Sequence, residues 1–301
     1  MALSLYQQQS ANIRKTWLIM FLFTLFITTL AYVYGKASGY GVSYAGIALI
    51  ISGFMSIGSY FFSDKLVIAT TGARQITEEE YPDYYRTVEN FSIANGLPMP
   101  RVYVMDDPSL NAFATGRDYK HAVVCATTGI LQVLNKPELE GVIAHELSHV
   151  KNYDIRLMGI VSVLVGSIAI LADMFMRSMW FGGGRRDDND RGGNNGIFVI
   201  IGIVFAILSP IVATLIQLAV SRRREFLADA SGALLTRYPE GLASALEKIS
   251  ASSRPTAHAS NATAHLFIAN PFKDKASKAW FASLFNTHPP IEERIKILRS
   301  M

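Results

Sequence analysis

Four long stretches without charged residues, one of them broken by a single acid, restrict what this chain can fold into. They run from Thr16 to Gly35, over residues 37–63, over residues 157–176 and from Gly196 to Ala219, and the acid is Asp173 in the third. Each is long enough to cross about 30 Å of hydrocarbon as a helix. The sequence therefore predicts about four transmembrane helices, in preference to two helical hairpins buried in a soluble core.

The first stretch has the position of a signal peptide, because Arg14 and Lys15 precede it near the start of the chain. Its apolar run is longer than that of a usual signal peptide, and a second span follows after Lys36. We therefore expect a retained N-terminal transmembrane hairpin over residues 1–62.

The remaining chain divides into two polar parts, residues 63–154 and 220–301. Between them we predict a second transmembrane hairpin, residues 155–219, whose flexible, glycine-rich loop covers residues 177–196. Because two spans separate the polar parts, both emerge on one side of the membrane and can form one domain. Basic residues near span ends favour the cytoplasm, and Arg14, Lys15 and the run Arg222–Arg224 lie on that side.

The charge pattern is not uniform, because the loop between the last two spans also carries arginines, partly offset by aspartates. We nevertheless predict a multi-pass protein of the plasma (inner) membrane with the folded domain facing the cytoplasm.

The net charge of +4 suits contact with an anionic bilayer. Basic residues interleaved with aromatic ones are missing, so we expect no nucleic-acid partner. The single cysteine, Cys125, excludes an intrachain disulfide and reads as a small apolar strand residue.

Helices outnumber strands in the polar parts, which predicts a mainly α fold with a small β-sheet. Residues 78–97 have the pattern of an amphipathic helix that stops at Asn95-Gly96. Residues 101–107 and 121–131 are rich in β-branched residues and predict two strands. Another helix follows Asn135, which can cap it together with Glu138.

That helix carries the sequence His145-Glu146-Leu147-Ser148-His149. Histidines four residues apart lie on one helix face, where both can bind one zinc ion at about 2.0–2.1 Å. Glu146 is offset around the helix, so its carboxylate reaches the open position of the metal and can act as a general base. The motif predicts a hydrolytic site with one Zn²⁺ per chain.

A hydrolytic zinc site needs a third protein ligand. Glu225 is the candidate, in a helical segment that also carries Asp229 one turn later on the same face. Asp229 would accept a hydrogen bond from a ligand histidine, and Arg222 is expected beside them. His258 and His265 are rival third ligands, although both lie near the flexible-looking segment 251–263.

The motif HELSH with the distant SRRREFLAD resembles the membrane-bound gluzincins, which include the HtpX heat-shock proteases and the CAAX prenyl protease. NAFATG at 111–116, SLFNTHPPIEERI at 283–295 and the four spans are similar to the same pattern, which is closest to HtpX. The resemblance covers nearly the whole chain. It implies a zincin-type α+β catalytic domain, Glu225 as third ligand, and cleavage of membrane or misfolded proteins in membrane protein quality control.

Two more residues receive roles from this resemblance. His288 is similar to a family histidine that stabilises the oxyanion, although His288-Pro289 also suits the start of a helix. Asn111 is similar to an asparagine near bound substrate, although an asparagine after Pro108-Ser109 also suits a turn. In addition, we expect the strand around residues 121–127 to be an edge strand that pairs with an extended substrate.

Three other classes of protein were weighed against this interpretation. An intramembrane site-2-type protease would carry the motif inside an apolar span, but this helix contains several charged residues. A transporter would carry ionisable groups within its spans, and here only Asp173 qualifies. A membrane scaffold without activity has no need of the residues that hydrolysis requires.

Overall fold

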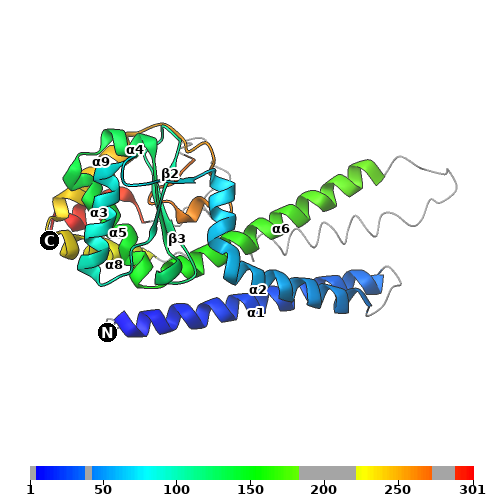
Figure 1. Cartoon of the computed structure of the whole chain (residues 1–301). Helices are drawn as coiled ribbons and strands as arrows, with labels where there is room; N and C mark the ends of the chain where they lie inside the picture. The colour runs from blue at the N-terminus through cyan, green and yellow to red at the C-terminus, as the bar shows by residue number, and fades with distance from the viewer. Residues whose placement is uncertain (1–4, 38–42, 183–221, 273–288) are drawn as a thin grey trace.

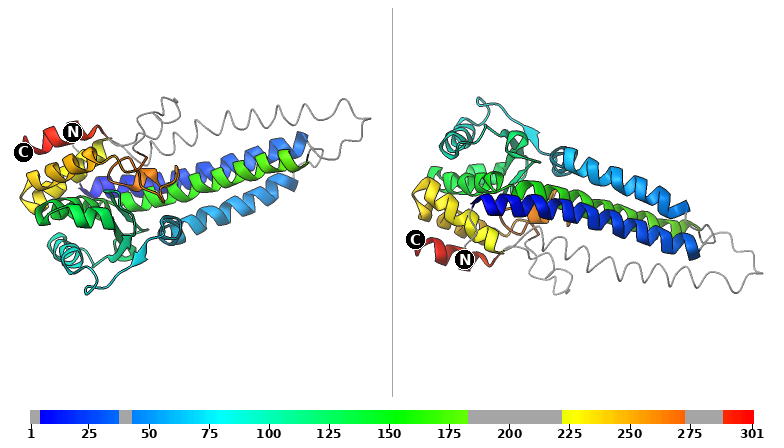
Figure 2. Two further views of the ribbon diagram at one scale, coloured as in Figure 1. Left: turned by 90° about the horizontal axis from the view of Figure 1, so that it is seen from above. Right: turned by 90° about the horizontal axis from the view of Figure 1, so that it is seen from below.

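The computed structural model describes residues 5–37, 43–182, 222–272 and 289–301. A domain of helices around a small sheet lies at one end of the molecule (Figure 1). Three long helices extend from it side by side in one direction, as both views of Figure 2 show: α1 (Leu5–Ala37), α2 (Ser43–Thr71) and α6 (Asp154–Gly182). The mainly α fold with a small sheet confirms the predicted fold class.

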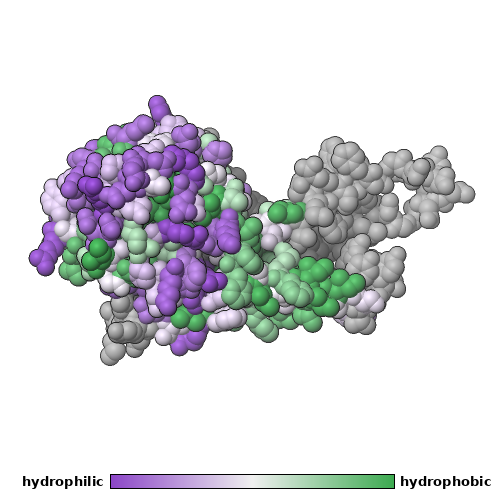
Figure 3. Space-filling model, in the orientation of Figure 1, coloured by the Kyte–Doolittle hydropathy of each residue, from purple (hydrophilic) through white to green (hydrophobic). Residues whose placement is uncertain are grey.

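Two of the described helices are long and apolar enough to cross a membrane, within Gln9–Thr29 and Ala45–Thr71. A third candidate is the pair formed by residues 136–151 and 154–170, whose two helices are bent by 83°. Only 28% and 17% of the first two windows are buried, and Figure 3 shows a broad apolar surface over these helices. Such a surface is typical of contact with lipid. The predicted fourth span, 196–219, lies outside the described residues.

Two helices continue beyond the ends predicted for them. Helix α2 runs to Thr71 instead of ending at residue 62, because Asp64 and Lys65 close the apolar run without breaking the helix. Gly72, with a φ of 67°, ends it. Helix α6 continues to Gly182, so residues 177–182 are helical where a loop was predicted.

Helices α1 and α6 pack through apolar side chains. Ile19, Met20 and Phe23 of α1 form a buried cluster with residues of α6 that include Leu157 and Ile160. Helix α2 contacts both of these helices. The N-terminal helix is therefore attached to the helix that directly follows the HELSH segment.

The sheet has the strand order β1-β2-β4-β3, with bounds β1 (Arg74–Gln75), β2 (Arg101–Met105), β3 (Ala112–Thr115) and β4 (Val123–Thr127). Strands β2 and β4 confirm the two strands predicted, and they pair in parallel. The expectation that residues 121–127 form an edge strand is wrong, because β4 lies between β2 and β3. The edge strand next to β4 is β3, which pairs with it antiparallel.

Local capping explains where the smaller helices begin and end. Helix α3 (Pro82–Asn95) begins four residues later than predicted and ends at Gly96, whose φ is 67°. Helix α4 (Thr128–Val133) occupies residues predicted as strand, because the hydroxyl of Thr127 accepts from Ile130 N at 3.2 Å and caps it.

Helix α5 (Lys136–Lys151) carries the HELSH segment and is the centre of the domain. Asn135 and Glu138 form the predicted capping box at its start. The helix packs against α3, α8 (Arg222–Thr236) and α9 (Pro239–Ala251), and its last turn leads into α6. Gly141 allows the close contact with α9, since a Cβ there would lie 2.6 Å from Leu242 N. Both histidines of α5 are buried as a result.

The remaining short elements complete the domain. They are the 3₁₀ helices η1 (Tyr119–His121) and η2 (Ala264–Leu266) and the C-terminal helix α11 (Ile291–Leu298). Next to η2, Phe267 pairs with Phe113 of β3 across an isolated bridge, and Ile268 N donates to Ala112 O at 2.9 Å. Residues 267–268 therefore lie against the outer side of the edge strand.

Candidate metal centre

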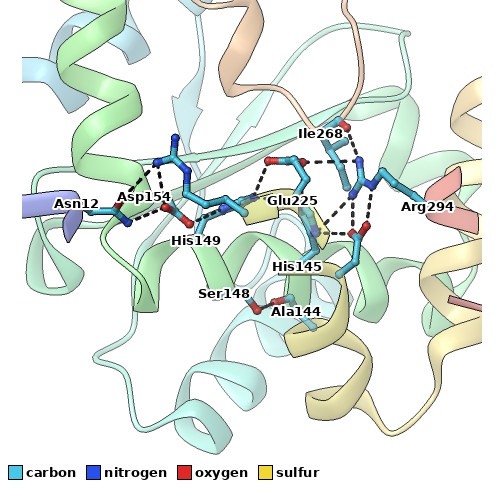
Figure 4. Close-up of polar contacts among 11 residues, drawn as sticks. Asn12, Ala144, His145, Ser148, His149, Asp154, Glu225, Ile268 and Arg294 are labelled. Carbon is cyan, nitrogen blue, oxygen red and sulfur yellow. Dashed lines mark hydrogen bonds and ion pairs between the residues drawn. The ribbon is translucent and has the colours of Figure 1, made fainter. Parts of the chain in front are cut away.

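His145 and His149 point to the same side of α5, as their spacing predicts (Figure 4). Their Nε2 atoms lie 3.2 Å apart. Both side chains are almost fully buried, with 1% and 4% of their surface exposed. Two imidazole nitrogens therefore face one small volume inside the protein.

Glu225, from the first turn of α8, reaches the same volume. Its carboxylate oxygens lie 3.8 Å from His145 Nε2 and 3.5 Å from His149 Nε2. Gly232 brings α8 close to α5, because a Cβ at this position would lie 3.0 Å from His145 N. The ligand atoms of the three residues all lie within 4.8 Å of one another. Glu225 follows His149 by 76 positions in the chain, and the fold brings the two side chains together.

The outer nitrogen of each histidine faces a carboxylate. His145 Nδ1 lies 2.9 Å from Asp229 Oδ1, and His149 Nδ1 lies 3.1 Å from Asp154 Oδ2. A carboxylate accepts hydrogen bonds, so each Nδ1 carries a proton and each Nε2 points inward. Two inward nitrogens 3.2 Å apart need a cation between them, which is a proton in the metal-free protein and a metal ion when one is bound.

The spacing of these atoms fits a metal ion. Ligand atoms at about 2.0–2.1 Å from a tetrahedral zinc lie about 3.3–3.4 Å apart. The two Nε2 atoms are 3.2 Å apart, and Glu225 places Oε1 3.5 Å from His149 and Oε2 3.8 Å from His145, so a movement of Glu225 that brings one oxygen close to both nitrogens would complete the geometry. Two imidazoles and one carboxylate are also the ligand set of hydrolytic zinc sites, which leave one position open. The residues present therefore fit a metal centre.

Charge around the histidines separates their pKa values. Burial lowers the pKa of His149, but the carboxylates of Asp154 and Glu225 outweigh it and raise the value to about 9. Burial also lowers the pKa of His145, and there Asp229 offsets the effect only in part. In the absence of a metal, His149 therefore holds the proton that a metal ion would have to displace.

Glu146 lies beside this centre and is 2% exposed. Burial raises the pKa of its carboxyl group to about 7; His149 opposes this shift and Glu225 adds to it. The backbone of Ala114 in the edge strand faces the same carboxyl group and favours its charged form. A carboxyl group with a pKa near neutrality can both accept and return a proton.

Two residues that contact the centre were not singled out from the sequence. Arg294 of α11 is fully buried and binds Asp229 through two hydrogen bonds, of 2.8 and 2.7 Å. It also donates to Ile268 O and lies 3.8 Å from Glu225. In the sequence Arg294 stands out only as part of the stretch PPIEERI, and its distance along the chain from the histidines does not predict a contact with them.

Asp154 is the second residue missed. It lies five positions after His149, outside the helical repeat, and reaches the histidine because the chain turns at Tyr153, whose φ is 59°. Asn12 Nδ2 of α1 donates to Asp154 at 2.8 Å, and Arg224 Nη1 lies 3.3 Å from it. A buried carboxylate thus joins the N-terminal helix to a ligand histidine.

Arg222, predicted beside the site, is exposed at the start of α8. Arg224, two residues later, contacts the site instead, because its guanidinium donates a hydrogen bond to Asp154. Helical geometry explains the difference, because Arg224 and not Arg222 lies on the side of α8 that faces α1 and α5. Asp229, in contrast, lies where its spacing from Glu225 placed it.

Among the described residues, the group that could hold a metal ion does not include His258 or His265. His258 is exposed, and His265 is buried with its Nε2 3.0 Å from Met158 O in α6. His288 lies outside the described residues. The side chain of Asn111 is buried and holds the backbone of Ala269, with its amide nitrogen 3.2 Å from Ala269 O. A contact between Asn111 and substrate stays a prediction.

Comparison with known proteins gives an independent result. Residues 79–301 match the model of peptidase family M48. A protein named protease HtpX homolog from Thermoanaerobacter pseudethanolicus is 47% identical over 301 residues, covering 99% of this chain and 98% of the relative. Another from Tropheryma whipplei (strain Twist) is 47% identical over 297 residues, with the same coverage.

One solved structure has the same fold. The crystal structure of S. mikatae Ste24p matches 94% of this chain with a TM-score of 0.50 and 18% sequence identity. This chain spans 66% of the length of that protein.

These matches confirm the likeness to HtpX proteases that the motifs indicated. The family model covers most of the chain, including the helices that carry His145, His149 and Glu225. Because family, ligand set and geometry agree, the chain belongs to peptidase family M48 and is a metalloprotease.

Proposed function

We propose that this metalloprotease is a zinc-dependent endopeptidase that cleaves membrane or misfolded proteins, as part of membrane protein quality control. The observation that carries the proposal is the convergence of His145, His149 and Glu225 beside a buried Glu146. Zinc is the metal of choice because two imidazoles and one carboxylate suit it, and it stays redox-inactive during hydrolysis.

His145, His149 and Glu225 would hold the metal, with Asp229 and Asp154 orienting the two histidines. When bound, zinc would act as a Lewis acid that polarises the scissile carbonyl and makes water more acidic. Glu146 takes a proton from the attacking water and then passes it to the leaving amine. Its position between the ligands and the backbone of Ala114 suits both transfers. His288 is proposed to donate a hydrogen bond to the oxyanion.

The edge strand β3 gives the substrate a place to bind. Ala114 of β3 contacts Glu146 through its backbone, so a peptide extended along this strand would pass the general base. Residues 267–268 cover the strand at Ala112 and Phe113, so an extended substrate would pair at Ala114 and Thr115, which are buried and would first have to be uncovered. Main-chain pairing of this kind tolerates many sequences. Asn111, at the start of the strand, would contact the substrate only by giving up a bond to Ala269.

The location of the centre favours substrates in or beside the bilayer. Asp154, which orients His149, is the first residue of α6, and Asn12 of α1 contacts it. Both helices continue as long apolar elements, so the metal ligands lie within a few residues of the expected membrane surface. We propose that the domain faces the cytoplasm from an integral inner-membrane location.

The test is a comparison of the purified protein with Glu146→Gln in detergent. We expect the variant to bind zinc like the unaltered protein and to lose at least about a hundredfold in hydrolysis of an unfolded protein, since it loses its general base. Glu140→Gln, on the same helix, is the matched control and should remain active. Equal hydrolysis by Glu146→Gln and the unaltered protein would contradict the proposal.

A further inference from the structure

A cavity of about 370 Å³ lies between α2 and the connection from β3 to β4, away from the metal centre. Its wall combines two aromatic rings, Phe61 and Phe62, with the cations Lys65, Arg101 and Arg117. Asp64 and His121 complete the wall. The proteolytic mechanism uses none of these residues.

The position of this cavity relative to the membrane follows from the helices that are expected to span it. Trp17, just inside the basic pair Arg14 and Lys15, stacks on Tyr60 of α2 with ring centroids 5.7 Å apart. Aromatic residues of this kind mark the boundary between hydrocarbon and headgroups. Phe61 to Lys65 follow Tyr60 directly, on the side toward the domain (Figure 1). The cavity therefore opens at the level of the lipid headgroups.

The cavity wall has more positive than negative charge. Asp64 is its only acid, and Arg101 pairs with it. Lys65 Nζ lies over the ring of Phe62, and the Arg117 guanidinium lies over that of Phe61, each 5.4 Å from the centroid. Arg117 also lies 3.5 Å from Asp118 and 2.7 Å from His121 Nε2, so Lys65 is the cation of this wall that has no acidic partner among the described residues.

A buried arginine next to the cavity adds to this charge. Arg156 is 8% exposed and lies between the rings of Tyr60 and Tyr153. It donates to the backbone oxygen of Arg117, and no carboxylate among the described residues is within ion-pair distance of it. A guanidinium with little water around it is stabilised by a nearby anion.

We propose that this cavity binds the phosphate of an anionic phospholipid. Lys65 and Arg117 would contact the phosphate, and the acyl chains would follow the exposed apolar side of α2, where Phe54 and Ile57 lie. A phosphate diester offers Lys65 the acceptor oxygens that this cation lacks among the described residues, and Arg117 would share its guanidinium between the phosphate and Asp118. Zwitterionic lipids fit less well, because their ammonium group would lie against the same cations.

Lipid binding in this cavity would also restrict the motion of the edge strand β3. Arg117 follows Gly116 in the tight connection between β3 and β4, where a Cβ on Gly116 would lie 2.5 Å from His121 O. The connection is thus packed too closely to move independently of the strands. This consequence, unlike the binding itself, rests on the proposed proteolytic function.

Binding can be measured by native mass spectrometry of the full chain in detergent, carrying Glu146→Gln to prevent self-cleavage. We expect phosphatidylglycerol to bind at least about tenfold more tightly than phosphatidylcholine. Lys65→Gln should weaken this binding about fivefold, since one cation near a lipid surface contributes about 1 kcal/mol. Lys65 is exposed, so its substitution leaves the fold intact. Adding Arg117→Gln should remove the preference for phosphatidylglycerol.

Arg14→Gln is the matched control, because Arg14 is an exposed cation on the same membrane side but outside the cavity. It should bind phosphatidylglycerol like the parent protein. Equal binding of both lipids, or undiminished binding by the double variant, would overturn the proposal. Displacement of the lipid by an equal concentration of glycerol phosphate would show a site for soluble phosphates and would overturn it too. None of these results depends on proteolysis.

Discussion

The protons on the two ligand histidines decide whether the centre can accept a metal. Asp229 and Asp154 each hold an Nδ1 proton, and this directs both Nε2 atoms toward Glu225. The sequence predicted that His145, His149, Glu225 and Asp229 would lie together, and helical spacing relates Asp229 to Glu225. It did not predict Asp154 or Arg294, since a chain reversal at Tyr153 and a contact between distant helices bring them to the site.

Asp154→Asn is expected to weaken zinc binding about 10- to 100-fold, because the amide holds the His149 Nδ1 proton less strongly than the carboxylate does. Competition with a zinc chelator measures this change. Asp118→Asn provides the same substitution outside the metal centre and should leave zinc affinity unaltered. Undiminished affinity in Asp154→Asn would show that this carboxylate does not orient the ligand.

Zinc affinity is expected to depend on pH because of His149. Its pKa of about 9 in the metal-free protein means that zinc must displace a proton below that pH. Affinity should therefore fall about tenfold for each unit that the pH drops below 9, and it should change little above that value. Chelator competition across this range tests the slope. A constant affinity between pH 7 and 9 would contradict the assignment of the proton to His149.

Among the helices and strands, prediction succeeded where local signals are strong. The capping box at Asn135 correctly predicted the start of α5, and the glycine at residue 96 correctly predicted the end of α3. Strand β3 was not predicted because its four residues, Ala112–Thr115, include two alanines and have no run of β-branched residues. Without β3, the position of β4 inside the sheet could not be deduced.

The contact between α5 and α9 should tolerate no added methyl group. In Gly141→Ala the new Cβ would lie 2.6 Å from Leu242 N, so the helices must separate, and we expect a loss of about 1–3 kcal/mol in the free energy of unfolding. Gly46→Ala, where a Cβ meets nothing within 4 Å, should not lower stability. Thermal unfolding in detergent compares the two. Equal stability of both variants would mean that the contact is looser than described.

For the whole molecule, the sequence predicted that two polar parts would form one domain beside the membrane. Residues of both parts meet at the metal centre, as the contacts of α5 with α8 show. The sidedness of the domain depends on basic residues near the span ends and stays a prediction. The described residues contain two or three candidate spans, and the fourth lies outside them.

Cysteine labelling with a membrane-impermeant maleimide tests the predicted orientation. Lys120→Cys, exposed on the domain, should react in inverted membrane vesicles and not in intact spheroplasts. Lys36→Cys, exposed at the opposite end of α1, should show the reverse (Figure 1). The native Cys125 does not interfere, because it is buried and burial raises the pKa of its thiol. Labelling of Lys120→Cys from outside would reverse the orientation.

The most direct test of the account is the zinc content and zinc K-edge X-ray absorption of the purified protein and of Glu225→Ala. We predict one zinc per chain, bound by nitrogen and oxygen atoms alone at about 2.0–2.2 Å, and at least about a tenfold loss of zinc affinity in Glu225→Ala. A protein that binds no zinc, or a Glu225→Ala variant with the same zinc content and the same absorption spectrum, would contradict the convergence of these three residues on one ion.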